Sequence, residues 1–221
     1  MAKQRNAILI SAVICTIIMM LIDGIVKPPY MIKSIIKIIV FGISILIFKL
    51  LHKENLLLFK IRKESFLKTI LLAVSVYLVI ILGYFLTRPI IDYSNITDTL
   101  TSTIGVSREN FIYVSLYISF INSLLEEIFF RGYCYLILRR FSSEKFSFLF
   151  SGAMFALYHG GMLTGWFHIG IYLLILALLM IAGFFFNMLD NKADSVLPSW
   201  LPHMFANFGI NTVGFMLFGL I

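Results

Sequence analysis

Three ionisable residues stand within one of the most apolar stretches of the chain. Glu126, Glu127 and Arg131 occur in SLLEEIFFRGYC, residues 123–134, where most neighbours are Leu, Ile, Phe or Tyr. A carboxylate can act as a general base, and a guanidinium can hold a carboxylate or stabilise negative charge. Charged side chains inside an apolar span are costly and often mark a functional site. This stretch is therefore the first candidate for chemistry.

The spacing of these residues separates the two carboxylates. Glu127 and Arg131 are four residues apart, so on a helix they share one face and can form an ion pair. Glu126 points about 100° away from Glu127, which leaves it free to face a different neighbour. This segment alone leaves two interpretations open: a buried ion network that holds helices together, or a catalytic carboxylate beside a supporting pair.

Two further apolar spans carry polar residues one helical turn apart. Phe155 and His159 stand in FALYH, and His203 and Asn207 stand in HMFAN. Counted from the basic residues that flank these spans, Glu126, His159 and His203 lie roughly 21, 21 and 17 Å into the layer. We therefore expect the three spans to present their polar groups at similar depths, around a single pocket.

The composition indicates that these residues are positioned by membrane-spanning helices. Of 221 residues, 60% are hydrophobic and 13% are charged, and the mean hydropathy is +0.97. A soluble domain is usually nearer half apolar and a quarter charged. We predict an all-α fold: a polytopic transmembrane helix bundle of seven or eight spans, in a single integral membrane domain over residues 1–221. The predicted spans lie near residues 7–26, 31–48, 67–87, 111–138, 146–160, 167–188 and 196–221.

The last of these spans is long, and a break between Gly209 and Gly214 would divide it in two. Two connecting segments can also be interpreted. Segment 49–66 mixes basic residues with Leu and Phe, which suits either a short interfacial helix or a solvated loop. Segment 88–110 is polar and rich in Thr and Ser, which predicts a loop or a lid.

The span over residues 111–138 is costly to expose to lipid. Each charged residue at mid-helix costs about 2.5–3.5 kcal/mol on insertion scales, so three cost about 9 kcal/mol. Twelve large aliphatic or Phe residues between Phe111 and Phe130 return only about 6 kcal/mol. The polar side of this helix must therefore face a bundle interior or a wet cavity.

The net charge of +7 reports orientation rather than a nucleic-acid partner. With the N-terminus in the cytoplasm, the cytoplasmic segments hold twelve of the 18 basic residues: Lys3, Arg5, Lys49, Lys53, Lys60, Arg62, Lys63, Lys68, Arg139, Arg140, Lys145 and Lys192. Such a bias follows the positive-inside rule. We expect a multi-pass protein of the cell membrane, surrounded by the lipid bilayer, with no nucleic-acid partner. A compact chain rich in Ile, Phe and Lys is typical of bacterial proteins.

Three motifs, each within an apolar span, share residue types, order and spacing with a known family: Glu126-Glu127-x-x-x-Arg131, Phe155-x-x-x-His159 and His203-x-x-x-Asn207. Together they resemble the motifs of the CAAX protease and bacteriocin-processing family (CPBP, or Abi), which includes the type II CAAX prenyl endopeptidases. The resemblance covers about residues 111–211, which would carry the protease core. It implies an intramembrane endopeptidase that hydrolyses a peptide bond of a membrane-associated protein or peptide precursor.

The resemblance also implies a role for each motif residue. Glu126 would be the general base that activates a water molecule, and His159 would help to hold that water. His203 and Asn207 would donate hydrogen bonds to the developing oxyanion. The remaining motif residues would support this arrangement: Glu127, Arg131 and Phe155.

No cofactor is favoured, and zinc is the alternative. The sequence contains no His-Glu-x-x-His motif, and a catalytic zinc usually has three protein ligands with one open position. Glu126, His159 and His203 could supply three ligands. We favour a metal-free mechanism, in which activity survives chelation but is lost in Glu126→Gln.

Two other classes of function stay open from the sequence. A non-catalytic bacteriocin immunity or regulatory membrane protein of the same family would bind a partner without cleaving it. An ion or proton carrier would use the buried Glu and His residues, but no internal repeat supports a transporter fold. Because prenylation is not a general bacterial modification, a peptide precursor or a membrane-bound regulator is favoured over a prenylated CAAX protein as the substrate.

Overall fold

The computed structural model describes residues 2–52, 59–60 and 63–221, and the regular elements in these ranges are helices. Within these described residues, six helical segments are long and apolar enough to cross a membrane: Ala2–Val26, Tyr30–His52, Phe66–Thr87, Phe111–Arg140, Glu144–Leu163 and Ile169–Ala193. They coincide with the first six spans that the sequence predicts. The prediction of an all-α polytopic bundle is therefore confirmed.

The seventh helix of the predicted set is α9 (Leu197–Leu217), which is not among those six. Its length of 21 residues is sufficient for a span, but polar side chains such as His203, Asn207 and Asn211 lower its hydropathy. The residues expected to do chemistry are thus the ones that make this helix costly to expose to lipid.

The prediction that the last span breaks between Gly209 and Gly214 is wrong, because α9 continues through both glycines. These glycines serve close packing instead. A Cβ atom on Gly209 would lie 3.0 Å from the side chain of Ile80, and one on Gly214 would lie 2.3 Å from the ring of Phe111. The eighth span that such a break would create is therefore not formed.

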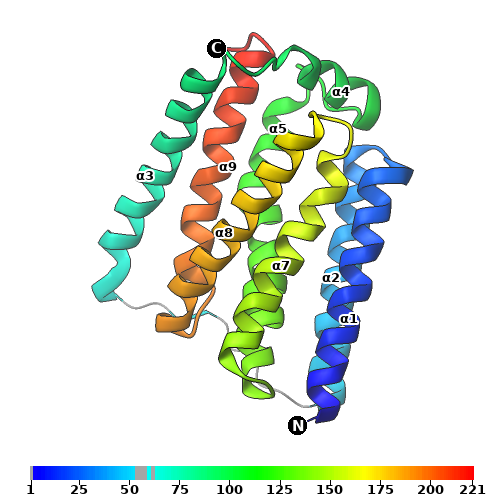
Figure 1. Cartoon of the computed structure of the whole chain (residues 1–221), viewed down its shortest axis with the longest axis vertical. Coiled ribbons are helices and arrows are strands. Elements are labelled where there is room, and N and C mark those ends of the chain that lie inside the picture. The colour runs from blue at the N-terminus through cyan, green and yellow to red at the C-terminus, as the bar shows by residue number, and fades with distance from the viewer. Residues whose placement is uncertain (1, 53–58, 61–62) are drawn as a thin grey trace. The chain divides into compact units, whose positions relative to one another are not determined.

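The chain divides into two compact units, of which the first contains residues 1–60 and 125–199. Its elements are α1 (Ala2–Leu21), the π-helical turn η1 (Ile22–Val26), α2 (Tyr30–His52), the π-helix η3 (Glu127–Ile137), the 3₁₀ turn η4 (Leu138–Arg140), α7 (Glu144–Leu163) and α8 (Ile169–Ala193). Helix α7 packs against both α1 and α8 (Figure 1). Ser143 caps its N-terminus, because the serine hydroxyl accepts a hydrogen bond from the N–H of Phe146 at 3.2 Å.

Small residues allow α7 to approach its two neighbours closely. A Cβ atom on Gly183 of α8 would lie 3.0 Å from the Cα atom of Gly152 on α7. A Cβ atom on Gly161 would lie only 2.6 Å from the carbonyl oxygen of Met20 on α1. Close backbone approach at small residues is a common way for helices to pack in membranes.

Aromatic side chains fill the interior of the first unit. The rings of Phe41 and Phe129 are stacked, with centroids 3.9 Å apart and an interplanar angle of 6°. Phe130 meets Phe155 edge to face at 5.4 Å. These contacts join α2, η3 and α7, and they surround the charged residues that enter the same interior from α2 and from the α6–η3 segment.

The second unit contains residues 61–124 and 200–221. Its elements are α3 (Lys63–Thr87), α4 (Ser94–Ile104), α5 (Phe111–Tyr117), the π-helical turn η2 (Ile118–Asn122), the start of α6 (Ser123–Glu126) and most of α9. Asn211 of α9 donates hydrogen bonds to the carbonyl oxygen of Ser115 at 3.1 Å and to the hydroxyl of Ser119 at 3.0 Å. These bonds tie α9 to α5 and η2.

The predictions for the two connecting segments, 49–66 and 88–110, have different outcomes. Segment 88–110 is not simply a loop, because it contains α4, which ends at Ile104 and is followed by Gly105 with a φ of +69°. Most of segment 49–66 beyond the end of α2 lies outside the described residues, so the choice between an interfacial helix and a loop stays a prediction.

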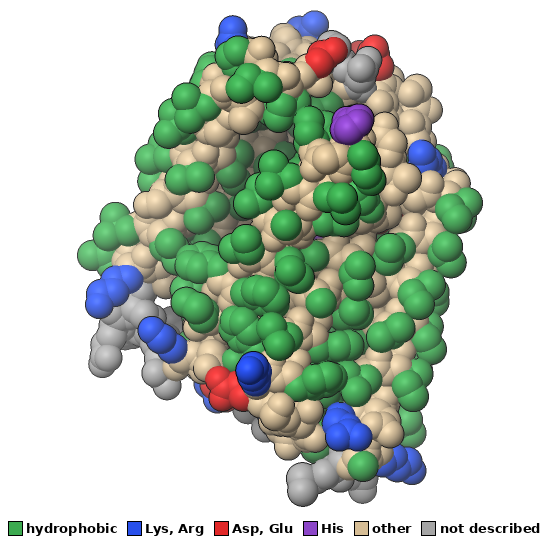
Figure 2. Space-filling view, viewed as in Figure 1, with side chains coloured by type: hydrophobic (Ala, Val, Ile, Leu, Met, Phe, Trp, Pro, Cys, Tyr) green, Lys and Arg blue, Asp and Glu red, His purple; other side chains and the backbone are tan. Residues whose placement is uncertain are grey.

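Hydrophobic side chains cover the middle of the helices seen in Figure 2, and Lys and Arg side chains lie near helix ends. Among the exposed residues are Ile10, Leu78 and Leu173, which are 60%, 57% and 56% exposed. Apolar exposure on this scale fits contact with lipid tails rather than with water.

Candidate active site

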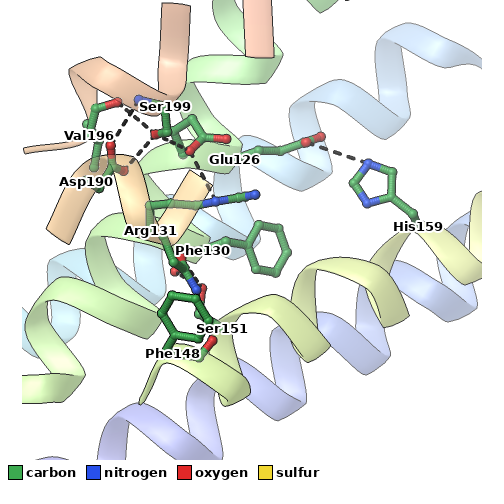
Figure 3. Close-up of polar contacts among 11 residues, drawn as sticks. Glu126, Phe130, Arg131, Phe148, Ser151, His159, Asp190, Val196 and Ser199 are labelled. Carbon is green, nitrogen blue, oxygen red and sulfur yellow. Dashed lines mark hydrogen bonds and ion pairs between the residues drawn. The ribbon is translucent and has the colours of Figure 1, made fainter. Parts of the chain in front are cut away.

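Glu126 lies at the junction between α6 and η3, inside the first unit, and is 2% exposed. Its two carboxylate oxygens face different partners. Oε1 forms an ion pair with the ammonium of Lys37 on α2. Oε2 lies 3.8 Å from Nε2 of His159 on α7 (Figure 3). The structure therefore brings together two of the residues that the sequence predicts for the site.

The orientation of His159 is set by its second ring nitrogen. Nδ1 lies 2.8 Å from the carbonyl oxygen of Phe155. Because a carbonyl can only accept, Nδ1 carries the hydrogen, and Nε2 is the nitrogen presented to Glu126. The separation of 3.8 Å between Nε2 and Oε2 is too long for a direct hydrogen bond and is one that a single water molecule can bridge.

Glu127 faces a different cluster, as the spacing of the two carboxylates predicts. Its Oε2 lies 3.3 Å from Nε of Arg131, and both side chains are fully buried. The hydroxyl of Ser199 lies 2.5 Å from the same Oε2 and 2.7 Å from Oδ2 of Asp190. The backbone N–H of Ser199 donates to Oδ1 of Asp190 at 3.0 Å (Figure 3). This cluster ties η3, α8 and the start of α9 together.

The hydroxyl of Ser199 has more acceptors than it can serve. Besides the two carboxyl groups, the carbonyl oxygen of Val196 lies 3.0 Å away. A hydroxyl has one hydrogen to donate. Arg131 brings a positive charge to Glu127, and the hydroxyl of Ser199 lies within hydrogen-bond distance of both buried carboxyl groups. Contacts of this kind lower the cost of burying charged groups.

The guanidinium of Arg131 lies close to two aromatic rings. Its Cζ is 4.0 Å from the ring centroid of Phe155 and 4.9 Å from that of Phe186. A guanidinium over a ring face is stabilised by a cation–π interaction, which is stronger away from water. Phe155 thus contacts Arg131 through its ring and His159 through its carbonyl oxygen, which links the supporting cluster to the candidate site.

His203 and Asn207 lie in the second unit, one turn apart on α9. His203 is 6% exposed, and the side-chain amide of Asn207 donates a hydrogen bond to the carbonyl oxygen of Ile118 at 3.2 Å. Their convergence with Glu126 and His159 stays a prediction.

Sequence reasoning missed Lys37, Asp190 and Ser199. A signal for Lys37 was present, because Lys33 and Lys37 stand four residues apart within an apolar span. A serine and a single aspartate near the end of a span give no comparable signal, since such residues occur there for many reasons.

The fit of a metal ion can be judged at Glu126. Within residues 2–52, 59–60 and 63–221, no group of three or more His, Cys, Asp or Glu residues is arranged to hold a metal. The ammonium of Lys37 is already paired with Oε1 of Glu126, and a divalent cation on this carboxylate would be repelled by that like charge. The ammonium of Lys37 therefore makes Glu126 a less favourable ligand for a divalent cation, and the choice between a metal-free and a zinc-dependent mechanism stays a prediction.

Comparison with known proteins adds one finding. Residues 108–209 match the family model described as type II CAAX prenyl endopeptidase Rce1-like. This region contains all three motifs, so the resemblance inferred from them is confirmed. Neither the curated proteins nor the solved structures provide a match.

Proposed function

We propose that this chain, which carries an Rce1-like region of the type II CAAX prenyl endopeptidase family at residues 108–209, is an intramembrane endopeptidase. It hydrolyses a peptide bond of a membrane-associated protein or peptide precursor. The observation that supports this proposal most is the buried carboxylate of Glu126, which has a histidine 3.8 Å from one oxygen and a lysine paired with the other.

Glu126 acts as the general base. A water molecule about 2.8 Å from both Oε2 of Glu126 and Nε2 of His159 is held by both groups. Glu126 takes a proton from this water while the water oxygen bonds to the carbonyl carbon of the substrate. The protonated Glu126 then returns the proton to the amine nitrogen as the carbon–nitrogen bond breaks, which leaves a carboxylic acid, an amine and the carboxylate of Glu126.

His203 and Asn207 are proposed to donate hydrogen bonds to the oxygen of the tetrahedral intermediate. A side-chain amide and an imidazole N–H are suitable donors, and a donor fixed before the reaction stabilises developing charge most strongly. The support for this role is the third motif of the family, in which these residues stand one turn apart.

The cluster around Glu127 and Arg131 is proposed to support the site rather than to react. Its contacts with Ser199 and Asp190 hold the helix that carries Glu126, and the ring of Phe155 lies on Arg131. Rigid support of this kind keeps a base within reach of its water.

The proposed mechanism is metal-free. The lysine beside Glu126 supports this choice, because it supplies the positive charge that a zinc ion would otherwise bring. Activity that survives exhaustive chelation agrees with this mechanism, whereas loss of activity on chelation and recovery with added zinc contradicts it.

The function can be tested with purified protein in liposomes. The probes are membrane-anchored peptides without a prenyl group and a farnesylated CAAX peptide, with the products identified by mass spectrometry. Wild type should cleave the unprenylated membrane peptides, and Glu126→Gln should reduce the rate by at least about 100-fold, the usual share of a general base. His159→Ala and His203→Ala should also reduce it strongly.

A matched control for the loss of a carboxylate is Glu109→Gln. Glu109 is exposed and lies outside the predicted site, with a pKa held below its ordinary range by a hydrogen bond from Ser107. Its replacement should leave cleavage unchanged. Full activity in all three site variants, or no cleavage of any probe by wild type, would count against the proposed function.

A further inference from the structure

We propose that Lys37 is a positioning residue of the same site: its ammonium keeps Glu126 ionised and fixes the carboxylate for proton transfer. This inference rests on the proposed function of Glu126. It extends the site beyond the family region at residues 108–209 into α2.

The contacts of Lys37 place its charge at the candidate base. Lys37 and Glu126 are each 2% exposed, and Nζ of Lys37 donates to Oε1 of Glu126. The ammonium also lies 4.6 Å from the ring centroid of Tyr158 and 5.8 Å from that of Phe41. A long, flexible side chain is thus held at one position by a carboxylate and two aromatic rings.

Burial and pairing act on Glu126 in opposite directions. Removal from water favours the neutral carboxylic acid, which cannot accept a proton from water. An opposite charge within about 4–6 Å favours the ionised form and displaces the titration of a carboxyl group by about one to three pH units. An ammonium on Oε1 therefore opposes the effect of burial and favours the carboxylate form, in which Glu126 can accept a proton.

Other charged groups near Glu126 have carboxylate partners of their own. Lys33, one turn before Lys37 on α2, pairs with Asp23 of η1 at 2.7 Å. Arg131 of η3 interacts electrostatically with Glu126 but is paired with Glu127.

On α7, His159 and Tyr158 also face Glu126. The phenol of Tyr158 brings no charge, and Nε2 of His159 lies 3.8 Å from Oε2, which is too long for a direct hydrogen bond. The ammonium of Lys37, by contrast, is hydrogen-bonded to Oε1.

The pair also fixes the direction of the carboxylate. With Oε1 held by Lys37, rotation of the carboxyl group is restrained, and Oε2 is the oxygen directed at His159. Oε1 therefore pairs with the ammonium of Lys37, and Oε2 is the oxygen that accepts the proton from water.

Infrared spectroscopy of the full chain in liposomes tests this inference without a substrate. A protonated buried carboxyl group gives an absorption band that its carboxylate lacks, and the band of Glu126 is identified by its loss in Glu126→Gln. In wild type this band should be absent at pH 7 and appear only in acid. In Lys37→Met it should be present at a pH about one to three units higher.

Lys33→Met is the matched control, because it removes a buried lysine one turn away on the same helix. It should leave the band of Glu126 at its wild-type pH. If Lys37→Met does not fold, Lys37→Gln keeps a hydrogen-bond donor without the charge and should show the same displacement. If wild type already shows the band of protonated Glu126 at pH 7, that result by itself overturns the inference.

The pH dependence of cleavage separates this inference from the proposed function. The acid limb of the rate profile should move to higher pH in Lys37→Met by the same amount as the infrared band. If cleavage depends on Glu126 but Lys37→Met displaces neither the acid limb of the rate profile nor the infrared band, the role of Lys37 is refuted and the proposed function stands. A displaced band in a protein that cleaves none of the probes would refute the proposed function and keep the pairing.

Discussion

Two adjacent glutamates have separate surroundings in this protein. Glu126 faces Lys37 and His159, whereas Glu127 faces Arg131 and Ser199. The step of about 100° between neighbouring helical residues makes this separation possible. The two interpretations of the sequence therefore apply to different residues: a supporting ion network at Glu127 and a candidate base at Glu126.

The shared hydroxyl of Ser199 leads to a prediction about stability. Ser199→Ala removes the hydroxyl that both carboxyl groups contact, so Oε2 of Glu127 and Oδ2 of Asp190 each lose one buried hydrogen bond. The free energy of unfolding should fall by about 1–3 kcal/mol, measured by denaturant titration in detergent micelles.

Ser147→Ala is a suitable control for Ser199→Ala. Ser147 is equally buried, but its hydroxyl donates to a carbonyl of the same helical turn, from Ser143 at 3.0 Å. Ser147→Ala should lower the free energy of unfolding by less than Ser199→Ala does. Equal losses in the two variants would show that the hydroxyl of Ser199 does not join the two carboxyls.

At the scale of elements, the spans were predictable and the way they are wound was not. Apolar runs located the six membrane-spanning segments, because burial in lipid demands length and hydrophobicity that the sequence displays directly. The π-helical winding of η3, which begins next to Glu126, has no comparable signal. Such winding is rare and often occurs at functional sites. The two glycines of α9 were misread because glycine can either break a helix or allow a close contact.

Because α1 and α7 approach each other closely at Gly161, adding a single methyl group there should lower the stability of the protein. In Gly161→Ala the added Cβ would meet the backbone of Met20 at 2.6 Å, and backbone cannot move aside as a flexible side chain can. The protein should lose about 1–3 kcal/mol of stability through overpacking, measured by thermal unfolding in detergent. Gly42→Ala on α2 is the control, because a Cβ there has nothing within 4 Å. A neutral Gly161→Ala would contradict the packing of these two helices.

For the whole molecule, the class of fold and the family region could be predicted from the sequence, and so could the proximity of Glu126 to His159. It did not reveal Lys37, because that residue lies some ninety positions before Glu126 and outside the three motifs. Contacts between distant segments arise from packing, which a single sequence does not display. The roles of His203 and Asn207 rest on their motif.

Polar contacts at one end of the first unit make its stability depend on pH. Asp194, just after α8, pairs with Lys60 at 2.5 Å and with Arg139 at 2.7 Å. The hydrogen bond from Lys60, with help from Arg139, holds the pKa of Asp194 below its ordinary value. A lowered folded-state pKa contributes stability above the unfolded pKa of about 3.9, and this contribution is lost as the pH falls through the lowered value.

Asp194→Asn isolates this contribution. Wild type should unfold at a higher temperature than the variant at pH 7. The difference should shrink as the pH falls below about 4 and vanish once the pH is below the lowered pKa of Asp194. Asparagine suits the site because the backbone there has a φ of +50°. The difference is expected to be small, since these side chains are partly exposed. A difference that grows in acid would contradict the assignment.

The central claim is that Glu126 activates a water molecule for peptide-bond hydrolysis. The most direct measurement is cleavage of a membrane-anchored peptide by purified protein in heavy-oxygen water, with the products analysed by mass spectrometry. Wild type should place the heavy oxygen in the newly formed carboxyl group, and folded Glu126→Gln should yield almost no product. Cleavage by Glu126→Gln at the wild-type rate, or wild-type product without the label, would contradict the account.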